Sequence, residues 1–294
     1  MASMGTTAFG RATTVQPEGA GRYAGFMPPD WKAPVLPHGG VATAIALRAA
    51  EEELAEPAQT LRSVTTVFAG QVHPGSLRID VSVLRRGRSL SQVVVDLTNA
   101  DADAGHHVVA VFGAHRAGFE FTDIQPPDAA SLDDARIFEP PPELEDDPGH
   151  FFEHVESRLA LGDYWGATDW EPNGASDRAY WYRFVEPPRR DDGALDPGAL
   201  VALCDTMPGA AYQRMGPDAP DGFCPSADLT VHILQDSRSE WLLAHNRARH
   251  AGDGYVSLEM RLWDPETGLV AYGTQVSFFS FQSGLAVHQV RPPS

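Results

Sequence analysis

Side chains able to do acid–base chemistry stand out in apolar stretches of the second half of this 294-residue chain. Asp205 interrupts the run ALVALCDTMPGA, and on a helix it lies well around from the centre of the apolar stripe, so its carboxylate need not point into the core. Apolar surroundings limit water and raise the pKa of a carboxyl group, toward the range in which it accepts a proton from water. Asp205 is therefore a candidate general base.

Two later runs supply polar partners for such a base. In PSADLTVHI, residues 225–233, strand alternation puts Ser226, Asp228 and Thr230 on one polar face. Asp228 or Thr230 takes the place of Ser226 if the register differs by two. Gln275 stands in the last apolar run, LVAYGTQVSFF. Taken singly, each side chain is also typical of a surface charge, a filler or a hydrogen-bonding neighbour.

The first half offers two further sets of candidates. His38 precedes Gly39 and Gly40 at a predicted helix start, where a histidine acts as a base or, more commonly, caps and packs. The two glycines carry no side chain, so a ligand or another backbone can come close. Arg85 and Arg88 flank Gly87 in the densest basic cluster of the chain, which predicts either a phosphate contact or a solvated turn.

Metal and nucleotide chemistry find no support in the motifs. His106 with His107, and His245 with His250, lack the accompanying cysteine or carboxylate spacing of a metal site. Glycine-rich nucleotide loops, Gly-x-Ser-x-Gly elbows and Cys-x-x-Cys pairs are absent from the sequence. We expect no metal and no cofactor.

Helix and strand periods indicate which elements position these residues. Residues 37–54 have small and apolar side chains at helical spacing, and residues 61–97 alternate as a meander with turns at 73–75 and 86–88. Proline and acidic residues dominate 118–148, a composition that predicts a linker without a packed core. A second helix follows, with Asp196 as N-cap, Pro197 at its first position and a break at Pro208 and Gly209.

The order of elements then repeats. A shift of about 164 positions puts helix on helix and strand on strand, with Asp205 opposite Val41 and Gln275 opposite Val111. We therefore expect an N-terminal unit at 1–117, a linker at 118–148 and a C-terminal unit at 149–294. Each unit is a long helix wrapped by an antiparallel sheet, so the fold class is α+β of the double-hotdog type.

Charge and composition restrict the partners and the compartment. A formal net charge of −18 disfavours nucleic acid and anionic membranes. No apolar run approaches the roughly 18 residues of a membrane span, and the N-terminus lacks the pattern of a secretory signal. Cys204 and Cys224 are expected as buried thiols. These features predict a cytoplasmic protein.

The chain resembles the acyl-CoA thioesterase II (TesB-like) family of double-hotdog hydrolases, particularly its shorter actinobacterial members. The resemblance runs from about residue 21 to 281, through HGGVATAIALRAA, FAGQVHPGSLRIDVSVLRRGRSLSQ, ALVALCDTMPGA, PSADLTVHI and LVAYGTQVSFF. It implies acyl-CoA hydrolysis by a water molecule held by Asp205, Ser226 and Gln275, where relatives often have Thr in place of Ser226. It also implies a homodimer or larger assembly.

Two alternatives remain open at this stage. The chain could be a hotdog hydratase or dehydratase of enoyl or hydroxyacyl thioesters with His38 as the base, or a protein that binds acyl thioesters without turnover. In the hydrolase, His38, Gly39, Gly40, Arg85, Gly87 and Arg88 would bind the substrate.

Overall fold

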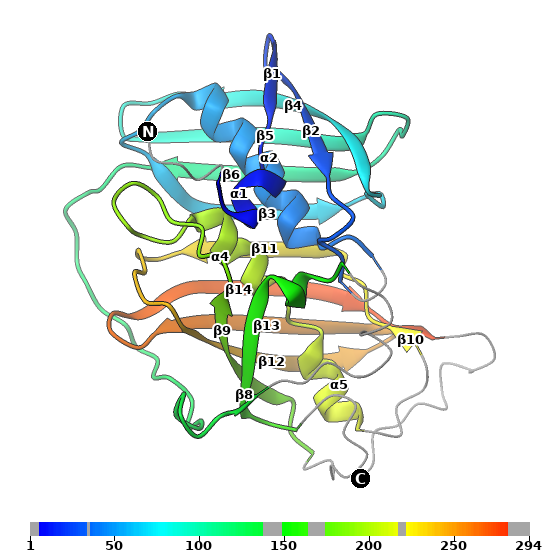
Figure 1. The fold of residues 1–294 in the computed structure, drawn as a ribbon, viewed down its shortest axis with the longest axis vertical. Helices are drawn as coiled ribbons and strands as arrows, with labels where there is room; N and C mark the ends of the chain where they lie inside the picture. Colours follow the sequence, from blue (N-terminus) through cyan, green and yellow to red (C-terminus); the bar gives the residue numbers. More distant parts are fainter. Residues whose placement is uncertain (1–5, 34–35, 138–148, 164–173, 217–221, 282–294) are drawn as a thin grey trace.

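The computed structural model describes residues 6–33, 36–137, 149–163, 174–216 and 222–281. The helices lie on one face of a long antiparallel sheet (Figure 1). Thirteen strands form this sheet in the order β1-β2-β4-β5-β6-β3-β11-β14-β13-β12-β9-β8-β7. The double-hotdog arrangement expected from the sequence is thus present, with the two repeats joined edge to edge between β3 and β11.

The first repeat wraps a single unbroken helix. Its elements are α1 (Ala8–Ala12), β1 (Gln16–Gly19), β2 (Arg22–Met27), α2 (Gly39–Leu54), β3 (Thr60–Phe68), β4 (Gly75–Arg85), β5 (Leu90–Asn99) and β6 (His106–Gly113). Side chains of β5 alternate between buried and less buried, as the sequence predicted. Ala55, in the left-handed region at φ 48°, ends α2.

The second repeat carries the broken helix. Its elements are β7 (Arg136–Ile137), the 3-10 turn η2 (Phe151–Glu153), β8 (Val155–Leu161), β9 (Asp177–Phe184), α4 (Pro197–Cys204), α5 (Gly209–Met215), β11 (Asp228–Ile233), β12 (Leu242–Gly252), β13 (Tyr255–Asp264) and β14 (Gly268–Phe278). A separate small sheet pairs β10 (Gly222–Phe223) with β15 (Ser280–Phe281). Asp196 caps α4 by accepting from the Gly198 amide at 2.7 Å, and Pro197 follows it, as expected.

The part of the linker that is described differs from the sequence prediction. Alanine and isoleucine side chains between 124 and 135 pack against Trp181, Trp263 and neighbouring apolar residues of the second repeat. The Trp181 indole donates to the Ala130 carbonyl at 3.0 Å, and β7 adds an edge strand to β8. The prediction of a linker without a packed core was wrong here, because a few small apolar residues suffice to cover sheet tryptophans. Residues 138–148 lie outside the described residues.

The two repeats meet on an approximate two-fold axis. Thr65 of β3 lies opposite Thr230 of β11, and their hydroxyls are hydrogen bonded at 3.0 Å. Strands therefore correspond at a shift of 165. The helices α2 and α4 cross where Gly40 meets Ala202 and Gly198 meets Ala44, which sets their shift at 158. The sequence predicted one uniform shift of about 164, which is corrected accordingly. Asp205 is equivalent to Leu47 of the first repeat, and Gln275 is equivalent to Ala110.

Candidate functional site

Asp205 lies where the helix of the second repeat breaks. It is the C-cap of α4 rather than a mid-helix residue, and Pro208 and Gly209 start α5 three and four residues later. Since α2 and α4 cross in opposite directions, this break faces the first turn of α2, which belongs to the other repeat. Asp205 therefore lies on the boundary between the repeats.

The Asp205 carboxylate is buried and held by two donors. Its side chain is 8% exposed. Oδ2 accepts from the Gly40 amide at 2.7 Å, and Oδ1 accepts from the Gln275 Nε2 at 2.6 Å. Burial raises the pKa of Asp205 to about 6, against the opposing effect of these two hydrogen bonds. The carboxylate is thus ionised near neutral pH and still basic enough to take a proton from water.

The glycines at the start of α2 make this contact possible. A Cβ on Gly40 would lie 2.8 Å from the Ala202 Cα and 2.9 Å from the Asp205 Cβ. A Cβ on Gly39 would lie 2.8 Å from the Phe68 ring and 3.0 Å from Asp205 Oδ2. His38, the N-cap of α2, makes no side-chain capping bond, so Asp205 supplies the missing cap from the other repeat.

Gln275 is 2% exposed and presents a free acceptor beside the carboxylate. Its Nε2 is occupied by Asp205, whereas its Oε1 is buried and has no hydrogen-bond partner. A buried unpaired carbonyl is unusual and is normally satisfied by water. Asp205 and Gln275, both singled out in the sequence, therefore meet as expected.

Ser226 reaches the same face of the sheet through a bulge. It pairs with Ser277, whereas Thr230 pairs with Thr274, so one extra residue of the β11 segment lies between the two pairs. Because paired residues share a face, Ser226 joins Gln275 on the helix side, and Thr230 lies on the outer side. The sequence prediction that Ser226 shares a face with Thr230 was wrong. No hydrogen bond joins Ser226 to Asp205 or Gln275.

His38 lies against the same carboxylate. Its Nδ1 is 3.5 Å from Asp205 Oδ2, and its side chain is 3% exposed. Burial lowers the pKa of His38 to about 3, so the imidazole is neutral. Such a weak base is poorly suited to general-base catalysis near neutral pH.

The arginine cluster lies at the opposite end of α2. Arg86, in the β4–β5 turn, donates to the carbonyls of Glu53 and Leu54 at the end of the helix, and the Gly87 carbonyl accepts from Gln59 at 2.8 Å. The 16 residues of α2 span about 24 Å. The structure therefore does not bring Arg85, Gly87 and Arg88 to Asp205.

An ion pair occupies that opposite end of the helix crossing. Arg48 of α2 contacts Asp196, the N-cap of α4, at 2.5 Å, and it contacts Glu51 at 2.6 Å. The Asp196 side chain is 3% exposed. The sequence analysis identified Asp196 as a cap and missed its partner; the matching Gly-x-x-x-Ala spacings at 40–44 and 198–202 could have indicated the crossing.

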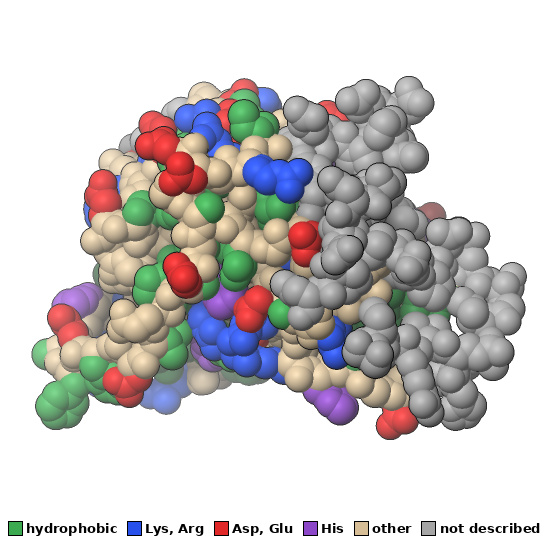
Figure 2. All heavy atoms as spheres, turned by 90° about the horizontal axis from the view of Figure 1, so that it is seen from below, with side chains coloured by type: hydrophobic (Ala, Val, Ile, Leu, Met, Phe, Trp, Pro, Cys, Tyr) green, Lys and Arg blue, Asp and Glu red, His purple; other side chains and the backbone are tan. Residues whose placement is uncertain are grey.

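Metal clusters, membrane-spanning helices and thiols were also compared with the expectations from the sequence. Within the described ranges no group of three or more His, Cys, Asp or Glu side chains could hold a metal ion, and no helix is long and apolar enough to cross a membrane. Cys204 and Cys224 are buried free thiols. Acidic side chains are scattered over the described surface in Figure 2, and basic ones gather near its middle.

Family models match both repeats of the chain. The model described as the acyl-CoA thioesterase N-terminal domain matches residues 27–113, and the model of the acyl-CoA thioesterase C-terminal domain matches residues 129–279. A search of curated proteins finds no match.

Solved structures share the fold over nearly the whole chain. A hot-dog-fold protein of unknown function from Alicyclobacillus acidocaldarius has a TM-score of 0.79 at 24% identity, covering 94% of this chain and 99% of that one. A putative thioesterase from Novosphingobium aromaticivorans has a TM-score of 0.71 at 25% identity, and the match covers 90% of this chain and 98% of that one. An acyl-CoA thioesterase II, TesB2, from Mycobacterium marinum has a TM-score of 0.72 at 21% identity, and the match covers 95% of this chain and 100% of that one.

Proposed function

This chain belongs to the acyl-CoA thioesterase family, and we propose that it hydrolyses acyl-CoA thioesters with a water molecule held by Asp205, Gln275 and Ser226. The observation that carries the proposal is the buried Asp205 carboxylate with the unpaired Gln275 Oε1 beside it. A water molecule placed between them would donate one hydrogen to each oxygen, which leaves its lone pair free for the thioester carbonyl carbon.

The reaction needs one proton transfer in each direction. Asp205 takes a proton from the attacking water as the new C–O bond forms, and the tetrahedral intermediate collapses with loss of the CoA thiolate. Asp205 then returns the proton to the sulfur. The acid leaves as a carboxylate and releases the remaining proton to solvent. No covalent enzyme intermediate forms.

The start of α2 is suited to stabilising the oxyanion. Gly39 donates its amide hydrogen to no other described residue, and it lies at the positive end of the helix dipole. A Cβ there would lie 2.8 Å from the Phe68 ring, so only glycine lets the start of α2 pack this closely against Phe68 and Asp205. An amide aimed at a developing oxyanion contributes about 10²–10³ in rate.

Hydratase chemistry is the second candidate, because His38 and Asp205 are in contact. The low basicity of the buried imidazole argues against it. A substrate panel separates the two reactions: the proposal predicts release of free CoA from saturated acyl-CoAs and no hydration of enoyl-CoAs. Hydration without CoA release would replace thioester hydrolysis as the activity.

Variants on the two faces of the sheet test the water site. Gln275→Leu should lower kcat by about 10², and Ser226→Ala by about tenfold, the value of one hydrogen bond. Thr230→Val is the matched control: it removes a hydroxyl bonded to Thr65 on the outer face and should leave kcat within about threefold. A kcat unchanged in Gln275→Leu, or lowered most in Thr230→Val, would contradict the assignment.

Assembly and location complete the proposal. The enzyme would act as a homodimer or larger homo-oligomer in the cytoplasm. Val67, Val109 and Val276 support the assembly, since they are 45%, 39% and 37% exposed and lie around the Thr65–Thr230 contact. Light scattering of the purified protein checks it.

A further inference from the structure

A buried nitrogen beside the proposed base lacks a partner. His38 Nδ1 makes no hydrogen bond and lies 3.5 Å from Asp205 Oδ2, beyond the usual hydrogen-bond length. A buried polar atom left unpaired costs about 1–3 kcal/mol. The carboxylate oxygen is the acceptor that a small shift of the ring would bring within reach.

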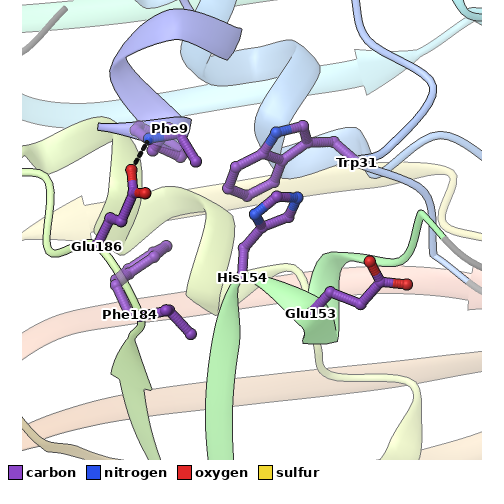
Figure 3. Close-up of a pocket in the computed structure, with 8 residues that line it drawn as sticks. Phe9, Trp31, Glu153, His154, Phe184 and Glu186 are labelled. Atoms are coloured by element: carbon purple, nitrogen blue, oxygen red, sulfur yellow. Dashed lines mark hydrogen bonds between the residues drawn. The ribbon is translucent and has the colours of Figure 1, made fainter. Parts of the chain in front are cut away.

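Aromatic side chains fix the plane of the His38 ring. Phe151 of the second repeat stacks on it, with centroids 4.1 Å apart and planes at 22°. Phe151 in turn packs edge-on against Trp31 at 6.0 Å. Figure 3 shows the next layer, the His154 ring along the Trp31 indole in a cleft between α1 and the second repeat. This column prevents the imidazole from swinging away.

The charges around the ring select one tautomer. A neutral imidazole carries a single hydrogen, and a lone pair on Nδ1 would face the negative Oδ2, so the hydrogen is favoured on Nδ1. Cys204, the titratable residue that precedes Asp205, is fully buried, and burial raises its pKa, so it adds no charge. Gly40 and Gln275 are the other donors that face the carboxylate.

We propose that His38 is a positioning residue for Asp205, donating its Nδ1 hydrogen to Oδ2 during the reaction and so stabilising the ionised carboxylate. Oδ2 then accepts from Gly40 and His38, and Oδ1 remains for Gln275 and the water. This role rests on the proposed thioester hydrolysis and differs from that of a base, because His38 exchanges no proton with the substrate.

The pH dependence of kcat/KM tests this role. His38→Leu should move the acid limb up by about one pH unit, equivalent to tenfold in the ionisation equilibrium of Asp205. His38→Asn places an amide hydrogen near the position of Nδ1 and should keep the limb near that of the parent. His38→Gln places its amide near Nε2 instead, so it should shift the limb as Leu does, and it serves where Leu fails to fold.

His106→Leu is the matched control. His106 is also a buried, neutral histidine, 7% exposed with an unpaired Nδ1, but it packs on the edge of Phe68 rather than on Asp205. Its acid limb should superimpose on that of the parent. An unmoved limb in both His38→Leu and His38→Gln, or an equal shift in His106→Leu, overturns the role of His38. Activity retained in Asp205→Asn would instead overturn the role of Asp205 as the base, and a parent that releases no CoA from any acyl-CoA would overturn the proposed hydrolysis itself.

Discussion

The two ends of the α2–α4 crossing have the same architecture and opposite electrostatics. At one end Asp205 reaches across to the start of α2 and meets neutral donors, the Gly40 amide and the Gln275 side chain. At the other end Asp196 caps its own helix and meets Arg48 from across the crossing. Both carboxylates are buried, but only Asp196 has a cationic partner.

This difference separates a stabilising carboxylate from a reactive one. A buried carboxylate paired with a guanidinium is a poor base, because the cation holds it in its ionised form. A buried carboxylate bonded only to neutral donors keeps a raised pKa, as Asp205 does. The crossing of α2 and α4 thus has a stabilising ion pair, Arg48–Asp196, at one end and a proton acceptor, Asp205, at the other.

Removing the cation of the Arg48–Asp196 ion pair should have the largest effect on stability. Arg48→Met leaves Asp196 buried without its ionic partner, which typically costs about 3–5 kcal/mol of unfolding free energy. Because the change lies at the far end of α2, kcat of the folded fraction should stay within about threefold. Urea unfolding and steady-state kinetics on the same preparation measure both quantities. A large loss of kcat with unchanged stability would reverse the assignment of the two ends.

Removing the charge of Asp205 at the other end should increase the free energy of unfolding, whereas removing Arg48 should decrease it. Burial raises the pKa of Asp205 from 3.8 to about 6, a difference of about 3 kcal/mol between its two protonation states. Well below pH 4 the residue is protonated in both the folded and the unfolded state, and stability is lost as pH rises from about 4 to about 6, because only the unfolded state ionises in that range. Asp205→Asn should therefore be more stable than the parent by up to about 3 kcal/mol at pH 7.5, with no gain below pH 4.

Asp264→Asn provides a control of opposite sign. Asp264 is also buried, but it accepts from Ser237, Ser239 and two backbone amides, and these bonds hold its pKa below the usual value. Its ionised form stabilises the fold above about pH 4, and that contribution is lost as pH falls through the lowered pKa. Asp264→Asn should thus lose stability at pH 7.5. Stability changes of the same sign in Asp205→Asn and Asp264→Asn would contradict the difference in pKa between the two carboxylates.

The sequence predicted the periodic parts of this molecule well. Helix α2, the cap at Asp196 and the break at Pro208 follow from local patterns, which short-range sterics and burial dictate. Asp205 and Gln275 were singled out by the resemblance to the thioesterase family, and Asp205 also by its place in an apolar helix. Their contact confirms that they lie together, while their catalytic role stays a proposal.

The features that the sequence analysis missed or predicted wrongly have long-range causes. The bulge before β11 turns Ser226 to the helix side, and a strict period of two cannot reveal an extra residue. The Arg48–Asp196 pair joins residues 148 positions apart through a helix crossing. The linker packs because Trp181 and Trp263 leave apolar surface on the outer face, which its own composition does not indicate.

The kcat of Asp205→Asn with an acyl-CoA that the parent hydrolyses tests the central claim most directly. The variant should remain folded, and kcat should fall by about 10²–10⁴, the usual contribution of a general base. A folded variant whose kcat stays within about threefold of the parent would show that Asp205 does not activate the water.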